Sequence, residues 1–111
     1  MKKVELGKIH DVHIGFGGYQ DAMFGMWFQF EGKGWGVGDG DGWWGTDTVP
    51  NESTKWTEKD RDEIFAKVMR KANELCRQAK VSSVNELKGI PVEVTFEGNK
   101  LASWRILEEV L

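Results

Sequence analysis

The residues best suited to catalysis are few and widely spaced in this chain. Its two histidines, His10 and His13, stand three positions apart, and its one cysteine, Cys76, lies far from both. Residues three apart on an extended strand point to opposite faces, so the histidines are not expected to share a metal ion. Neither histidine has a nucleophile at a spacing that signals a catalytic dyad. The sequence therefore favours a protein that is not an enzyme, with no catalytic residue, metal or cofactor.

The most unusual feature is a run of glycines at every second position. Its members are Gly32, Gly34, Gly36, Gly38, Gly40 and Gly42. In a strand this pattern strips one face of side chains, at about 0.5–1 kcal/mol for each glycine. Two explanations are open. Either Trp27 and Gln29 of a neighbouring strand cover the bare face, over Gly38 and Gly36, or a ligand or second subunit lies on it. A second subunit would make the protein a homo-oligomer. We expect Gly40 and Gly42 to lie beyond the paired part of the hairpin and to take part in binding.

Two adjacent tryptophans, Trp43 and Trp44, follow this run in a segment without periodicity that extends from 39 to 55. Long irregular segments are often functional. In an extended chain only one of the two can point inward, which leaves the other as an anchor for a partner or for stacking on a base or sugar. The alternative is that both fold over the sheet as a minor core.

A long helix is predicted after Thr57. Apolar residues recur there at three- and four-residue spacing and form one stripe: Ile64, Phe65, Val68, Ala72, Leu75, Cys76 and Ala79. Thr57 with Asp60 resembles a capping box, and Ser83 with Glu86 predicts a second cap. Because Cys76 lies in the stripe, we expect a buried, slow-reacting thiol.

Two hairpins and an N-terminal strand are predicted to form the sheet. In the first hairpin, a turn at Gly32-Lys33 pairs Phe30 with Trp35. The N-terminal strand carries Val12, Ile14 and Phe16 on its apolar face, which Val4 and Leu6 extend across an irregularity near Gly7.

The second hairpin is predicted in the tail. A three-residue loop, 98–100, pairs Val94 with Trp104 and Phe96 with Ala102, and it keeps the apolar residues on one face, which a two-residue loop does not. Arg105 then stands opposite Glu93. It either forms an ion pair with that residue or binds an anion such as a phosphate.

These elements give an α+β fold, in which an antiparallel sheet of about five strands packs against one long helix in a single domain, residues 1–111. Fifteen Lys and Arg against eighteen Asp and Glu give a net charge of −3, which argues against direct nucleic-acid binding. The single cysteine, the charged start and the lack of a long apolar run favour a cytoplasmic protein away from membranes.

Three stretches resemble a group of small, largely uncharacterised proteins encoded by bacteriophages and prophages. They are GFGGYQDAMFGMWFQF, KGWGVGDGDGWW followed by KWTEKDRDEIF, and VSSVNELKGIPVEVTFEGNKLASWRILEEVL. The group shares a Gly-rich hairpin, a Trp-Thr-Glu helix start and a terminal Ser-Trp-Arg-Ile-Leu strand. The resemblance implies a phage accessory protein in the bacterial host cytoplasm, with an anti-defence role. Phage proteins of this size include sponges for cyclic nucleotide signals and inhibitors of CRISPR effectors.

Two partner classes follow. The first is a small nucleotide-like anionic ligand, bound by aromatic stacking and by donors from Arg105 and Asn99. The second is a host defence protein, onto which the chain docks through its Gly/Trp loop, the segment from 39 to 55 that contains Trp43 and Trp44. The candidate ligand- or partner-binding residues are Tyr19, Gly40, Gly42, Trp43, Trp44, Asn99 and Arg105.

Overall fold

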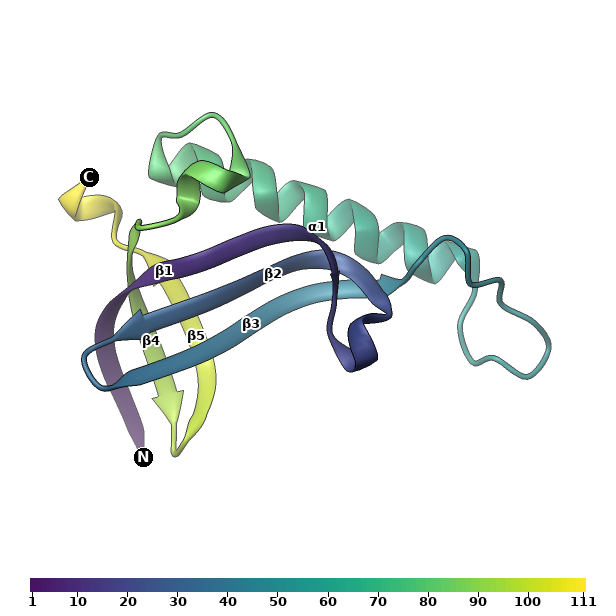
Figure 1. Cartoon of the computed structure of the whole chain (residues 1–111), viewed down its shortest axis with the longest axis horizontal. Helices are drawn as coiled ribbons and strands as arrows, with labels where there is room; N and C mark the ends of the chain where they lie inside the picture. Colours follow the sequence, from purple (N-terminus) through teal and green to yellow (C-terminus); the bar gives the residue numbers. More distant parts are fainter.

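The chain folds into one antiparallel sheet with a long helix packed against it. The computed structural model describes all residues from 1 to 111. Its main elements are β1 Lys2–Gly17, β2 Met23–Gly32, β3 Trp35–Trp44, α1 Glu58–Ala79, β4 Pro91–Glu97 and β5 Lys100–Ile106. Three short 3-10 turns complete the chain: η1 Tyr19–Asp21, η2 Val84–Leu87 and η3 Glu108–Val110. The strand order is β3-β2-β1-β4-β5, which confirms the predicted α+β class with about five strands and one long helix (Figure 1).

The helix α1 forms where its local signals predict it. Thr57 is the N-cap: its hydroxyl accepts a hydrogen bond from the Asp60 N–H at 3.3 Å, and its own N–H donates to Asp60 Oδ2 at 2.8 Å. The second predicted capping box, Ser83 with Glu86, is also present and opens η2. Both caps satisfy backbone donors that a helix start leaves unpaired, so they define these boundaries locally.

The core lies between α1 and one face of the sheet. Its members are Ile9, Val12, Met26, Phe28, Phe30, Val68, Ala72, Leu75, Ala79, Leu87, Val92, Val94 and Ile106. The alternation in β2 and β4 predicts their contributions to this face correctly. Cys76 borders the core but is only half-buried, so the prediction of a buried thiol is wrong, while its slow reaction stays a prediction. Burial, with a smaller effect of the Glu86 carboxylate, still raises the pKa of this thiol.

The strand β1 is shared by both halves of the sheet. Its residues 7–17 pair with β2 and its residues 2–8 pair with β4. The register shifts between Ile9 and Asp11, so His10 is an extra residue, a β-bulge. At this point the Ile9 N–H donates to the Ile90 carbonyl at 2.9 Å, and the Ile9 carbonyl accepts from the Gly89 N–H at 2.7 Å.

This bulge reverses the alternation of side chains along β1. Ile9 and Val12 both enter the core although they stand three residues apart. Val4 and Leu6 instead keep 56% and 65% of their surface exposed. The prediction that they extend the apolar face is therefore wrong, because one extra residue between Leu6 and Val12 places Val4 and Leu6 on the opposite face. The irregularity also lies at His10 and not near Gly7.

The first hairpin turns one residue later than predicted. Gly32 pairs with Trp35 and Phe30 pairs with Val37, so the turn is Lys33-Gly34 and the predicted pairing of Phe30 with Trp35 is wrong. The later turn shifts the partner of each β2 residue by two positions along β3. Since side chains alternate with a period of two, every side chain stays on its predicted face. The apolar pattern therefore does not distinguish the two registers. A positive φ of 80° at Gly34 suits glycine at this turn.

The tail hairpin combines the predicted register with a different loop. Val94 pairs with Trp104 and Glu93 with Arg105, as predicted. The loop, however, has two residues, 98 and 99, and a register shift between Thr95 and Phe96 follows, so Phe96 faces Leu101 rather than Ala102. A bulge of one residue keeps the faces consistent in the presence of the shorter loop.

The sheet curls until its two edge strands approach each other. The Trp104 Nε1–H of β5 donates to Asp39 Oδ2 of β3 at 2.9 Å, across 65 positions of sequence. The Trp104 ring also lies 5.0 Å from the Phe28 ring and 4.6 Å from the Phe30 ring, between centroids. The helix α1 lies along the curled sheet, and η1 and the loop that precedes α1 lie at the end of the molecule where α1 begins (Figure 1).

The position of the bulge can be tested with two substitutions in β1. We expect Ile9→Ala to lower the free energy of unfolding by about 2–5 kcal/mol, because Ile9 is fully buried. Leu6→Ala should change it by no more than about 0.5 kcal/mol, because Leu6 is exposed. Urea unfolding of both variants measures the difference, and similar losses would mean that the bulge is misplaced.

Candidate functional site

The bare glycine face is covered from within the chain. Trp27 of β2 pairs with Gly40, and a methyl group added at Gly42 would lie 2.8 Å from Trp27 Cζ2. A methyl group at Gly40 would overlap the same ring. The indole Nε1–H donates to the Gly15 carbonyl at 3.0 Å, which holds the ring in place.

Gly40 and Gly42 therefore serve packing inside the paired hairpin. The prediction that they lie beyond its paired part is wrong, because β3 stays paired with β2 as far as Trp44. The two covering side chains also contact different glycines from those predicted. Gln29 lies against Gly38 rather than Gly36, and Trp27 lies against Gly40 rather than Gly38.

Substitutions on this face should show the difference between covered and open glycines. Gly40→Ala places a methyl group in the Trp27 ring and should lower the free energy of unfolding by about 1–3 kcal/mol. Gly36→Ala is the control: its methyl group would meet only the Phe30 carbonyl, at 3.6 Å, so stability should stay level or rise by about 0.4–1 kcal/mol. Thermal or urea melts measure both, and an equal loss would contradict this account of the glycine run.

The adjacent tryptophans end β3 and are both half-buried. Trp43 packs edge to face with Trp56, with centroids 6.0 Å apart, and Trp44 pairs with Met23. The Trp43 Nε1 is buried without a hydrogen-bond partner. Neither ring is a free anchor, so the arrangement is nearer to the minor core than to the exposed-anchor alternative.

A buried arginine holds the loop that follows β3. Arg61 is 6% exposed, and its Nη1 donates to the carbonyls of Gly45 and Thr48 at 2.8 Å each. Its guanidinium also lies 5.4 Å from the Trp56 ring centre. The sequence analysis missed this residue, although Arg61 precedes Phe65 and Val68 at the three- and four-residue spacing of the apolar stripe, which was the available signal.

Arg105 is neutralised by two carboxylates. Its Nε lies 3.1 Å from Glu93 Oε1, and its Nη2 lies 2.9 Å from Glu109 Oε2. Hydrogen bonds from Arg105 lower the pKa of Glu109 to about 2, and the same bonds raise the pKa of Arg105. The ion-pair alternative is thus the observed one, and an anion at Arg105 would have to displace both acids.

The structure does not bring the sequence-predicted residues into one site. Tyr19 lies exposed in η1, and Trp43 and Trp44 end β3. Asn99 lies in the β4–β5 loop, at the other end of β5 from Arg105. The two histidines do share a face, contrary to the prediction, since His10 contacts Glu31 and His13 pairs with Trp27. No three potential metal ligands gather anywhere in the structure.

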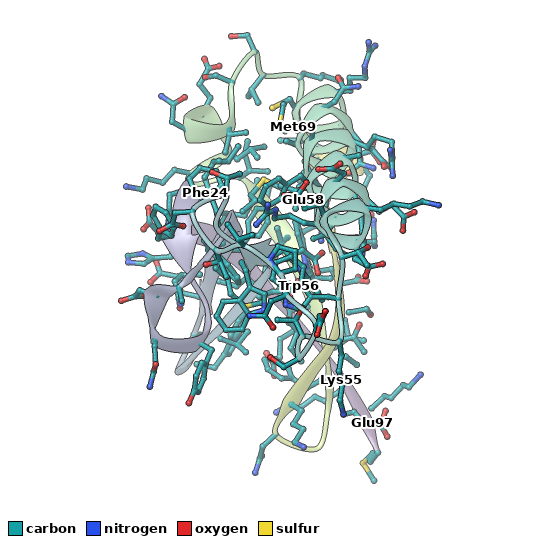
Figure 2. The ribbon with its side chains drawn as sticks, turned by 90° about the vertical axis from the view of Figure 1, so that its right-hand side faces the viewer. Phe24, Lys55, Trp56, Glu58, Met69 and Glu97 are labelled. Carbon is teal, nitrogen blue, oxygen red and sulfur yellow. The ribbon has the colours of Figure 1, made fainter.

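An open apolar cleft lies between β1, β2, α1 and the loop that follows β3. It has a volume of about 500 Å³. Its lining residues are Ile14, Phe16, Phe24, Gly25, Gly45, Thr46, Asp47, Phe65, Val68 and Met69. Phe24 contacts Phe16 and Phe65 edge to face, with centroids 5.2 and 6.4 Å apart. Figure 2 faces this end of the molecule and shows Phe24 on the strand side and Met69 on the helix side.

Apolar side chains at this cleft keep much of their surface exposed. The exposed fraction is 43% for Ile14, 55% for Phe16 and 63% for Met69. The sequence analysis missed the cleft because Ile14, Phe16 and Phe65 were assigned to the core by their periodicity. In the structure α1 covers β2 at Phe28 and Phe30 but leaves the end of the sheet at Phe16 open.

A second hollow, the basic groove, lies between α1 and β5. It is also about 500 Å³ and is lined by Lys67, Arg70, Lys71, Glu74, Leu75, Gln78, Trp104 and Arg105. Lys71 Nζ lies 5.5 Å from the Trp104 ring centre. Asp41 lies 3.8 and 3.9 Å from the ammonium groups of Lys67 and Lys71, whereas Arg70 has no carboxylate within ion-pair distance.

Fold and sites together define an α+β protein with a curled antiparallel sheet, one covering helix and an open apolar cleft. Comparisons with protein-family models, with curated proteins and with solved structures gave no match to this chain. None of its helices has the length and apolar character needed to cross a membrane.

Proposed function

We propose that this chain is a non-enzymatic binding protein that docks an apolar protein segment in the apolar cleft. The observation that carries the proposal is the convergence of Ile14, Phe16 and Met69, all largely exposed, on one hollow. Contiguous exposed apolar surface of this kind is characteristic of interaction sites. A polar residue at Met69, which is 63% exposed, would cost folding little, so the apolar choice there points to binding.

The geometry of the cleft suits a protein segment. Its volume falls within the range of about 300–1,000 Å³ typical of binding pockets. Phe24 holds Phe16 and Phe65 in edge-to-face contacts, so the aromatic walls are formed in advance and their side chains lose little conformational entropy on binding. The cleft would receive two or three apolar anchors, as grooves that bind amphipathic helices do.

The resemblance to phage-encoded proteins supports an accessory, anti-defence role in the host cytoplasm. In that setting the docked segment belongs either to a host defence protein or to another copy of the chain. The docking surface then differs from the one expected from the sequence, because the cleft replaces Trp43 and Trp44 of the Gly/Trp loop.

Selection of random displayed peptides on the purified native protein tests this proposal. We expect peptides with spaced apolar anchors, and we expect Met69→Ser and Phe16→Ser to weaken their binding at least about tenfold, which corresponds to about 1.4 kcal/mol. Leu6→Ser is the matched control, since Leu6 is as exposed as Met69 but lies outside the cleft. A failure to select any peptide with protein that is monomeric in solution, or equal binding by Leu6→Ser and Met69→Ser, would contradict the proposal.

The basic groove supports a second candidate function, the capture of a small nucleotide-like anion. Four cationic side chains line it, in a chain whose net charge is −3. Lys67 and Lys71 share one carboxylate, Asp41, and Arg105 is paired with Glu93 and Glu109. Arg70 is in no ion pair, and Trp104 lines the groove beside Lys71. This site replaces the one expected at Arg105 and Asn99, since Arg105 already binds two acids.

Thermal melts with a panel of cyclic nucleotides test this candidate. A ligand at about 100 times its dissociation constant should stabilise the protein by about 2.7 kcal/mol. Arg70→Gln should abolish the shift, while Arg77→Gln, on the same helix but outside the groove, should keep it. Without any shift across the panel, or with a shift that survives Arg70→Gln, nucleotide capture in this groove is wrong.

A further inference from the structure

The chain exposes more surface than a compact monomer of its size. Its accessible surface is 7404 Å², whereas a folded monomer of 12.6 kDa exposes about 6,200 Å². Its radius of gyration is 15.4 Å, against about 13 Å for a compact domain of 111 residues. The surplus, about 1,200 Å², is larger than the surface that one partner contributes to a standard interface, about 800 Å².

The apolar cleft carries both halves of a self-complementary contact. Met69 projects from α1 at one side of it and is 63% exposed. The rings of Phe16 and Phe24 form the other side. In an interface with two-fold symmetry the same patch meets itself, so a knob and a hole on one patch are both filled at once. A thioether against aromatic rings is a favourable contact.

Charge does not oppose such an interface. The chain is acidic, but Asp47 is the only ionisable residue among those that line the cleft. Two copies can therefore meet at this patch without bringing many like charges together, which is otherwise the main electrostatic cost of self-association for a charged protein.

We propose that a second copy of this chain covers the apolar cleft, with Met69 of each copy seated against Phe16 and Phe24 of the other. This inference rests on the proposed function, since it names the protein whose segment the cleft docks. The segment is the middle of α1 around Met69. This contact between two copies makes the active form a dimer with two-fold symmetry.

Sedimentation equilibrium over a dilution series tests the dimer. We expect the wild-type mass to approach twice 12.6 kDa at high concentration, and Met69→Lys to remain at 12.6 kDa. Met69→Leu should keep the dimer, and so should Leu6→Lys, which places the same charge on an equally exposed site outside the cleft. Circular dichroism checks that Met69→Lys is folded. A wild-type mass of 12.6 kDa at every concentration, or equal dissociation by Leu6→Lys, would overturn the proposal.

Photocross-linking locates the contact. With p-benzoylphenylalanine at position 16 of the purified protein, the adduct should join two copies and map to α1 near Met69. An adduct to any other part of the second copy, or none at all, overturns the proposed geometry.

The sedimentation and peptide-selection results together distinguish a failure of the dimer from a failure of the proposed function. If the wild type is monomeric but selected peptides still need Phe16 and Met69, self-association is wrong and protein docking in the cleft stands, with a foreign segment as its occupant. If the selected peptides are also insensitive to both residues, the two proposals fail together.

Discussion

The single extra residue at His10 in β1 is the constraint on which the rest of the structure depends. It bends one strand of 16 residues so that its first part pairs with β4 and its second part with β2. Because the bulge turns Ile9 and Val12 toward the same side, both parts of the strand contribute to one core under α1. The same bend curls the sheet until β3 and β5 approach, where the hydrogen bond from Trp104 to Asp39 joins them. A regular strand in place of the bulge would send Leu6 into the core and Ile9 out of it.

The residues that make this sequence unusual serve folding, and the candidate site is built from residues that look ordinary. The alternating glycines allow the Trp27 ring to lie directly on the β3 backbone, which explains why so many glycines are accepted in one strand. Two arginines also serve folding. Arg61 holds the loop after β3, and Arg105 joins Glu93 to Glu109. The apolar cleft, in contrast, arises between α1 and the ends of β1 and β2, where Phe65 and Met69 of the helix form one wall but leave Phe16 55% exposed.

The apolar cleft and the basic groove differ in the kind of partner that each could bind. A cleft with aromatic walls fixed by mutual contact is suited to a protein segment, and its single ionisable side chain makes an apolar segment the better match. The basic groove and the cleft use overlapping stretches of α1 but share no lining residue: Lys67, Arg70 and Lys71 line the groove, whereas Phe65, Val68 and Met69 line the cleft.

The sequence by itself determined the features that depend on neighbours a few residues apart. The helix start at Thr57, the cap at Ser83 and the buried faces of β2 and β4 all follow from local hydrogen bonds or from alternation. Tertiary structure decided the turn at Lys33-Gly34, because a slip of two residues preserves every face and only the complete hairpin chooses between registers. It also decided the bulge at His10, which follows from the need of one strand to pair with two partners in different directions. Tertiary structure also decided the cleft. Whether Phe16 is buried or exposed depends on the position of α1, which begins more than forty residues later in the chain. No local sequence pattern contains that information.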